Sequence, residues 1–133
     1  RLLKMNLLGY EWIRAIMESY RRNSDFTSGN LFWMYNDCWP ASMSWSFVDY
    51  YGMPKASFYA FRRLSRPYTS SVTSENGEYK ITLSNLTNNS VSGTVRATFM
   101  KKSDNFAIAE KKELELSDIR TVYIISHTNS PFT

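Results

Sequence analysis

Apolar side chains recur at helical spacing over the first 22 residues. Within residues 2–22 they return every three or four positions, at Leu3, Leu7, Tyr10, Ile13, Ile16 or Met17, and Tyr20. This spacing aligns them along one side of an α-helix. The pattern ends at Arg21 and Arg22, where the helix dipole favours positive charge, and turn-forming residues follow. The pattern therefore predicts an amphipathic helix over residues 2–22.

A short apolar run and a second amphipathic pattern follow. Residues 31–35 are nearly all apolar and are bounded by turn residues, which is typical of a strand buried on both faces. The serine-rich residues 40–46 indicate a long loop. Residues 52–55 predict a helix start with proline in the first turn, and the expected buried face of this helix is Phe58, Phe61 and Leu64. The first half is thus predicted to be an α/β fragment that does not close a sheet by itself.

The second half changes to a period of two, which is typical of strands. Residues 79–83 and 91–100 alternate between apolar and polar, and residues 119–125 form a run rich in β-branched side chains. Turns are expected at Asn76-Gly77, at Asn88-Asn89 and over residues 102–105. Short strands at this spacing predict an antiparallel β-sandwich of immunoglobulin type with five or six strands.

Charge and composition exclude several classes of protein. The net charge is +4, and the basic residues occur in pairs rather than in a stripe, so no nucleic-acid partner is expected. No apolar run reaches about 20 residues, so no membrane span is expected. Cys38 is the only cysteine and His127 the only histidine, which leaves no intrachain disulfide and no support for a metal site. We expect no metal and no other cofactor.

The aromatic residues gather in the predicted loop and its flanks. Three of the four tryptophans, Trp33, Trp39 and Trp45, lie there. A loop at the C-terminal end of a parallel strand is where α/β barrels build their active sites. Aromatic rings stack on the C–H faces of sugars, and nearby amide and carboxylate groups bind hydroxyls. Carbohydrate is therefore the first substrate class to consider.

Residues 31–67 resemble the last strand, loop and helix of the catalytic barrel in glycoside hydrolase family 2, and most of all its β-mannosidase group. The residues that carry this resemblance are Trp33, Asn36-Asp37-x-Trp39-Pro40, Ser44-Trp45-Ser46, Asp49-Tyr50 and the Gly-x-Pro-Lys-Ala of residues 52–56. The resemblance implies that residues 1–65 are the last helix, strand and helix of a (β/α)8 barrel. It implies that residues 66–133 are the all-β, immunoglobulin-like sandwich that follows the barrel in that family.

The resemblance also implies an activity for the longer protein. Retaining glycosidases use two carboxyl groups about 5–5.5 Å apart, one as nucleophile and one as acid/base. In the family these are glutamates at the ends of the fourth and seventh barrel strands, and the chain opens in the helix after the seventh. We therefore expect no catalytic residue in these 133 residues and no glycosidase activity from them alone. The full protein is expected to act on β-linked sugars, most of all β-mannosides, in a bacterial periplasm, outside the cell or in a lysosome.

Four residues are candidates for substrate binding by resemblance. Trp33 matches the indole that forms the floor of the subsite for the cleaved sugar, and the peptide bond after it is often cis. Asn36 and Asp37 bind sugar hydroxyls, or orient the neighbouring glutamates, or else cap the loop through hydrogen bonds from side chain to backbone. Trp39 is expected to line the pocket. Cys38 is expected to be a small buried residue.

A different class of function is also open. The chain can be a non-catalytic module whose sandwich binds carbohydrate or protein. Such a sandwich needs exposed rings on a sheet face, yet all four tryptophans lie in the first half, which disfavours this reading.

Self-association is a further expectation. A single barrel strand exposes unpaired backbone on both edges. We therefore expect residues 1–65 to associate with another copy or to bury the strand against the sandwich.

Overall fold

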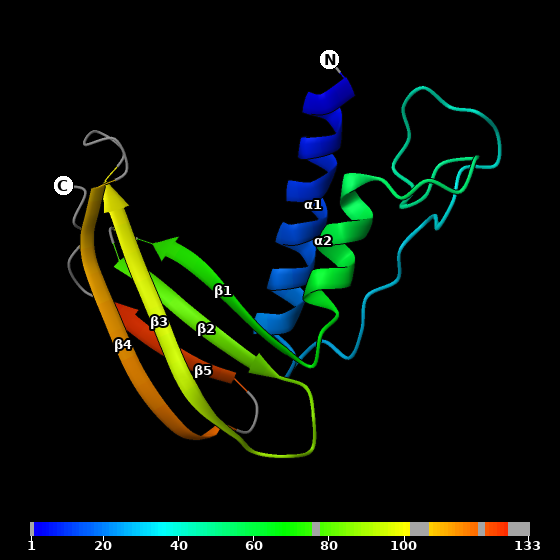
Figure 1. Cartoon of the computed structure of the whole chain (residues 1–133). Coiled ribbons are helices and arrows are strands. Elements are labelled where there is room, and N and C mark those ends of the chain that lie inside the picture. Colours follow the sequence, from blue (N-terminus) through cyan, green and yellow to red (C-terminus); the bar gives the residue numbers. More distant parts are fainter. Residues whose placement is uncertain (1, 76–77, 102–106, 120–121, 128–133) are drawn as a thin grey trace. The chain divides into compact units, whose positions relative to one another are not determined.

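The computed structural model describes residues 2–75, 78–101, 107–119 and 122–127. The chain divides into two compact units, Arg1–Arg66 and Pro67–Thr133. The first unit holds helices α1 and α2, and the second holds strands β1 to β5 (Figure 1). The chain therefore consists of a helical unit followed by small antiparallel sheets.

The first unit is built on two helices, α1 (Leu2–Arg22) and α2 (Ala56–Leu64). They lie side by side, and the long segment between them leaves the helix pair and returns at the start of α2 (Figure 1). The core consists of Ile13, Met17, Phe47, Ala60 and Leu64, with half-buried rings around it. The helix predicted over residues 2–22 is confirmed.

Three phenylalanine rings connect the segment between the helices to this core. The ring centroid of Phe32 lies 5.3 Å from that of Phe47 and 5.4 Å from that of Phe61, and Phe47 and Phe61 are 5.0 Å apart. These distances are in the range where aromatic pairs attract. As predicted, Phe61 and Phe58 pack against the core and Leu64 is buried within it.

The strand predicted over residues 31–35 is wrong. This segment forms no ladder, and Leu31 and Trp33 are 104 % and 83 % exposed. Within the segment, the carbonyl of Tyr35 accepts hydrogen bonds from the N–H groups of Phe47 and Val48. The next residue, Asn36, forms an isolated bridge with Val48, which forms another with Pro54. A strand needs a neighbour that satisfies its backbone groups residue after residue. In the described part of the first unit, backbone pairing extends over only one or two residues at a time. The segment between the two helices is therefore a loop.

The second helix starts later than predicted. Residues 52–55 precede α2, whose first residue is Ala56, and Lys55 has an extended backbone. The reason is a turn centred on Asp49, whose carboxylate accepts hydrogen bonds from the N–H groups of Tyr51 and Met53 at 2.9 and 2.8 Å. Gly52 has a φ of 85°, which glycine adopts without strain and which an α-helix does not contain.

The second unit contains two antiparallel sheets. Strands β1 (Tyr68–Glu75), β2 (Glu78–Asn85) and β5 (Val122–His127) form one sheet in the order β1-β2-β5. Strands β3 (Val91–Lys101) and β4 (Ala107–Ile119) form the other.

The strand predictions for the second half agree with these sheets. The predicted strands over residues 79–83 and 91–100 lie within β2 and β3, and the one over 119–125 overlaps β5. The predicted turns at Asn76-Gly77 and over residues 102–105 lie outside the described residues. Across the part of the chain that the structure describes, no helix has the length and apolar character needed to cross a membrane.

We predict that Leu64→Ala lowers the free energy of unfolding of the first unit by about 2–4 kcal/mol, because it leaves a cavity in the core. The measurement is urea unfolding followed by tryptophan fluorescence, which reports on this unit because all four tryptophans lie in it. Leu3→Ala is the matched control, since Leu3 is exposed on α1 and its loss is expected to change stability by less than about 0.5 kcal/mol. Equal effects of the two variants would contradict the described core.

Candidate functional site

The segment between the helices is organised around the carboxylate of Asp37. This residue is 2 % exposed, although the segment around it lies at the surface. The hydroxyls of Ser44 and Ser46 both donate hydrogen bonds to its Oδ1, and the ammonium of Lys55 lies 2.7 Å from its Oδ2. We call these four residues the Asp37 cluster. It joins positions 7, 9 and 18 residues apart in sequence.

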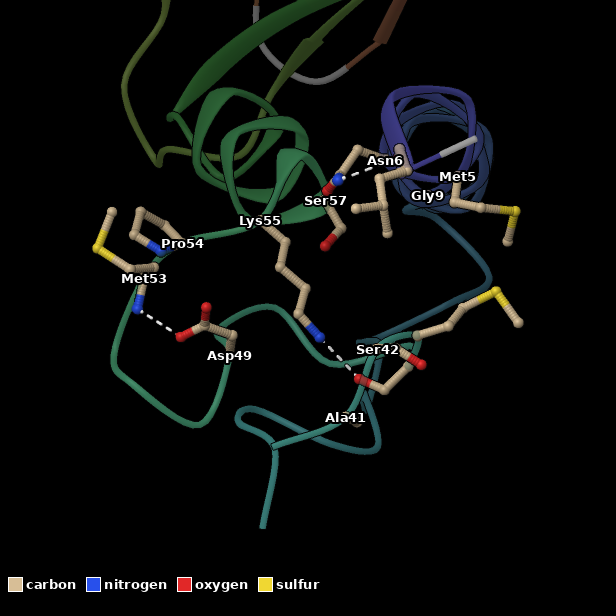
Figure 2. Close-up of a pocket in the computed structure, with 13 residues that line it drawn as sticks. Met5, Asn6, Gly9, Ala41, Ser42, Asp49, Met53, Pro54, Lys55 and Ser57 are labelled. Carbon is tan, nitrogen blue, oxygen red and sulfur yellow. Dashed lines mark hydrogen bonds between the residues drawn. The ribbon is translucent and has the colours of Figure 1, made fainter. Parts of the chain in front are cut away.

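Lys55 is directed entirely toward this cluster. Its Nζ lies 2.7 Å from the hydroxyl oxygens of both Ser44 and Ser46, in addition to its ion pair with Asp37. An ammonium group has three N–H donors, so these three acceptors account for all of them. Figure 2 shows the Lys55 side chain extending from the start of α2 toward the loop that contains Ser42. The start of the second helix is thereby bound to the middle of the loop.

The electrostatic balance at Asp37 favours the ionised form. Burial raises the pKa of its carboxyl, but hydrogen bonds from Lys55, Ser44 and Ser46, together with the positive charge of Lys55, lower the pKa to about 2 from 3.8. Asp37 is therefore a carboxylate at neutral pH and holds no proton that it could donate. The ion pair is a fixed structural charge pair rather than an acid/base group.

Backbone hydrogen bonds run through the same region. The N–H groups of Phe47 and Val48 both donate to the carbonyl of Tyr35 at 3.0 Å, and the N–H of Asp37 donates to the carbonyl of Val48 at 3.0 Å. The N–H of Lys55 donates to the carbonyl of Phe47 at 2.8 Å. The three short segments around residues 36, 47 and 54 therefore lie beside one another, with the Asp37 cluster joining them through side chains.

The predicted substrate-binding residues divide into two groups. Trp33 is exposed, Trp39 is 65 % exposed, and Asn36 is also exposed, with its Nδ2 donating to the carbonyl of Asp37 at 3.1 Å. Asp37 instead lies inside the loop, and its carboxylate oxygens are bound by the cluster. Of the two roles considered for Asp37, the geometry favours the one in which it holds the loop.

Two further features of this segment bear on the sequence predictions. The peptide bond between Trp33 and Met34 is cis, as the resemblance implies. Cys38 was expected to be buried, and this is wrong, because its side chain is exposed. The neighbouring Asp37 is the residue of this stretch that is buried.

A cavity of about 300 Å³ lies between the first turns of α1 and the loop (Figure 2). Leu2, Met5 and Asn6 line it from the helix, and Ser44, Met53 and Lys55 are among the residues that line it from the other side. Trp33, Asn36, Asp37 and Trp39 do not line this cavity. The cavity borders the Asp37 cluster, but the rings predicted to bind sugar, Trp33 and Trp39, lie outside it.

The described residues contain no group of three or more His, Cys, Asp or Glu side chains that could hold a metal ion.

The sequence predicted only some of the polar residues of the Asp37 cluster as parts of a site. Ser44, Ser46 and Lys55 belong to the motifs that carry the family resemblance, but their common partner was not predicted. The sequence showed two serines at Ser-x-Ser spacing and a lysine after Pro54. Neither feature indicates by itself that all three side chains bind Asp37.

Comparisons with known proteins point to one class of enzyme. No protein-family model matches the chain. Over 54 residues, or 41 % of this chain, the sequence is 43 % identical to β-mannosidase B of Aspergillus flavus and of Aspergillus oryzae. Over 53 residues it is 42 % identical to β-mannosidase B of Emericella nidulans. The chain spans about 6 % of the length of each of these relatives.

A solved structure extends the similarity over most of the chain. The crystal structure of a β-D-mannosidase from Dictyoglomus thermophilum matches 91 % of this chain and 15 % of that chain, with a TM-score of 0.72 and 25 % sequence identity. The class that these findings indicate is glycoside hydrolase. More particularly, they confirm the resemblance to the β-mannosidases of family 2.

We predict that Asp37→Asn lowers the free energy of unfolding of the first unit by about 3 kcal/mol, because Lys55 is left without its counter-charge in a largely buried setting. Urea unfolding followed by tryptophan fluorescence measures the change. Asp25→Asn is the control, since it also removes one carboxylate but at an exposed position. A loss for Asp37→Asn no larger than for this control would contradict the described cluster.

The pKa of Asp37 also predicts an acid dependence of stability. A folded-state pKa of about 2, below the ordinary 3.8, means that ionised Asp37 stabilises the fold above about pH 4 and loses this contribution as the pH falls toward 2. We expect the stability difference between the unmodified chain and Asp37→Asn to shrink by about 2 kcal/mol between pH 5 and pH 2. Urea unfolding at a series of pH values tests this, and a pH-independent difference would contradict it.

Proposed function

We propose that this chain forms the C-terminal part of the catalytic barrel, together with the immunoglobulin-like sandwich that follows it, of a retaining glycoside hydrolase acting on β-linked sugars. The proposed substrates are β-mannosides. Residues 1–65 would belong to the barrel and residues 66–133 to the sandwich. The observation that carries the proposal is the match to the D. thermophilum β-D-mannosidase, which covers 91 % of the chain.

The surface of the first unit supports a place within a larger domain. α1 buries Ile13 and Met17 but leaves large apolar side chains exposed over its first half, among them Leu3, Leu7 and Leu8. Contiguous apolar patches on a soluble protein are commonly contact surfaces. The neighbouring helices of a barrel would cover such side chains.

The second unit supports the sandwich assignment. A cavity of about 360 Å³ is lined by residues of both sheets, including Leu83 of β2 and Val95 of β3. Side chains of the two sheets therefore face a common space, as they do in a sandwich.

The sugar-binding role of the first unit rests on its exposed rings and amide. We propose that Trp33 and Trp39 contact the C–H faces of sugar rings and that Asn36 hydrogen-bonds a hydroxyl. Asp37 would contribute to this site by holding the loop, because its carboxylate is already bound by the cluster. This set combines apolar ring faces with one polar group that fixes orientation, as ligand sites generally do.

The carboxylates of the first unit are engaged in ways that suit structure rather than hydrolysis. Arg14 binds both Glu11 and Glu18, with N···O distances of 2.6 and 3.1 Å. Asp37 has a pKa of about 2 and is bound by Lys55. A retaining mechanism needs one carboxyl group that carries a proton and a second that attacks the sugar. The catalytic pair would therefore come from other residues of the glycosidase.

We predict that the purified 133-residue chain does not hydrolyse p-nitrophenyl β-D-mannopyranoside. The measurement is release of p-nitrophenolate over a day at several pH values, compared with buffer and with a known β-mannosidase. Hydrolysis faster than in buffer, in fractions that contain the purified chain, would contradict the proposal that the catalytic residues lie outside these 133 residues.

The proposed function is tested on the native gene product, purified from its source, with its intact mass determined and its activity on β-mannosides measured. We expect hydrolysis, and we expect Trp33→Ala to lower kcat/KM about tenfold or more through lost stacking, equivalent to about 1.4 kcal/mol. Tyr68→Ala is the control, since Tyr68 is an exposed ring at the start of β1, outside the loop that carries the proposed sugar contacts. A native product of 133 residues that binds no sugar would overturn the proposal.

The alternative, a non-catalytic carbohydrate- or protein-binding sandwich, lacks a comparable observation. Among the side chains that the structure describes in the second unit, one aromatic ring, that of Tyr68, is exposed, and it lies at the start of β1. A ring-lined binding face on a sheet would require several.

A further inference from the structure

We propose that Lys55 is a positioning residue of the sugar site. Through the Asp37 cluster it would hold the segment that carries Trp33, Asn36 and Trp39 in one conformation. The sugar-binding part of this inference rests on the proposed function, whereas the mechanical part, the holding of the loop, does not.

The three candidates for sugar contact lie at the surface of the loop. Trp33, Asn36 and Trp39 are all exposed, so neighbouring side chains do little to restrict them. Their positions therefore depend on the backbone to which they are attached. Asp37 lies within this stretch, directly after Asn36 and two residues before Trp39, and it is the one residue of the four that is buried. Whatever holds Asp37 determines the course of the backbone on both sides of it.

Asp37 is held by hydrogen bonds and by an opposite charge. A buried carboxylate is unfavourable unless hydrogen bonds and a counter-charge compensate for its lost hydration. The hydroxyls of Ser44 and Ser46 supply hydrogen bonds, and Lys55 supplies both a hydrogen bond and the positive charge. Without the ammonium group, Asp37 would be ionised with two hydroxyl hydrogen bonds but no counter-charge, or would have to take up a proton. Opening of the loop would then restore its hydration.

Backbone hydrogen bonds also join Lys55 to the loop. Lys55 lies directly before α2, and its own N–H donates to the carbonyl of Phe47, whose N–H donates to the carbonyl of Tyr35. Residue 55 is thus bound to the loop through both its side chain and its backbone. The helix that follows is packed into the core through Ala60 and Leu64, so the loop is attached to an element of the core of the first unit.

The mechanical part is tested by amide hydrogen exchange on the 133-residue chain. Lys55→Met keeps an unbranched side chain, one atom shorter than that of lysine, and removes the charge and the hydrogen-bond donors. We expect the amides of Asp37, Phe47 and Val48, which donate across the loop, to exchange about tenfold faster or more, while the amides around Ile13 in α1 change little. Lys55→Arg, which restores charge and donors, should recover most of the protection. Lys4→Met removes one charge at an exposed position of α1 and is the control.

The positioning part is tested by the kinetics of the native gene product on an aryl β-mannoside. Because Trp33, Asn36 and Trp39 would contact the sugar in both ground state and transition state, their displacement should raise KM about tenfold and change kcat by less than about threefold. A variant that merely unfolds a fraction of the enzyme would lower kcat and leave KM unchanged. Lys55→Arg should return KM toward the unmodified value.

The outcomes separate the two levels of the proposal. Unchanged exchange in Lys55→Met would overturn the holding role of Lys55, and faster exchange with an unchanged KM would overturn its role in positioning the sugar site. If exchange increases as expected but the unmodified native product hydrolyses no β-linked sugar, the proposed function falls and the holding role stands.

Discussion

The burial of one carboxylate organises the segment that connects the two helices. Asp37 lies in a stretch of the chain without regular secondary structure, where backbone groups alone would define no single path. Its carboxylate binds two hydroxyls and an ammonium from three places in the sequence. A buried carboxylate needs such partners, because it has lost its hydration. The cluster therefore joins the stretch that carries the exposed tryptophans to the residue that directly precedes α2.

The first unit combines a small, ordinary core with an unusually apolar surface. Its core of five buried side chains holds α2 against the second half of α1, and the Phe32, Phe47 and Phe61 rings connect the loop to it. Around this core, side chains such as Leu7 and Trp12 remain exposed. In the proposed barrel these two surfaces have different tasks, since the exposed face of α1 meets neighbouring helices and the loop faces the sugar.

Agreement between sequence and structure depended on how local each pattern was. The spacing of Ile13 and Met17 predicted α1, because neighbours three or four residues apart determine one face of a helix. Alternation over residues 79–83 likewise predicted β2. The strand predicted over residues 31–35 was wrong because a buried strand needs neighbouring strands, and the described residues of this unit supply none. Phe32 packs against the core, but Leu31 and Trp33 are exposed. The chemistry of Asp37 was left open for the same reason, since its partners lie up to 18 residues away.

The sequence by itself determined the helix of the first unit, the strands of the second, and the resemblance to β-mannosidases, because periodicity and local motifs are properties of neighbouring residues. Only the tertiary structure decided which polar residues face inward. Trp33, Asn36, Asp37 and Trp39 are close in sequence and were predicted to act together, yet Asp37 is buried and the other three are exposed. The physical reason is that a carboxylate is buried only where distant donors and a counter-charge converge on it, and chain folding alone brings Ser44, Ser46 and Lys55 to that place.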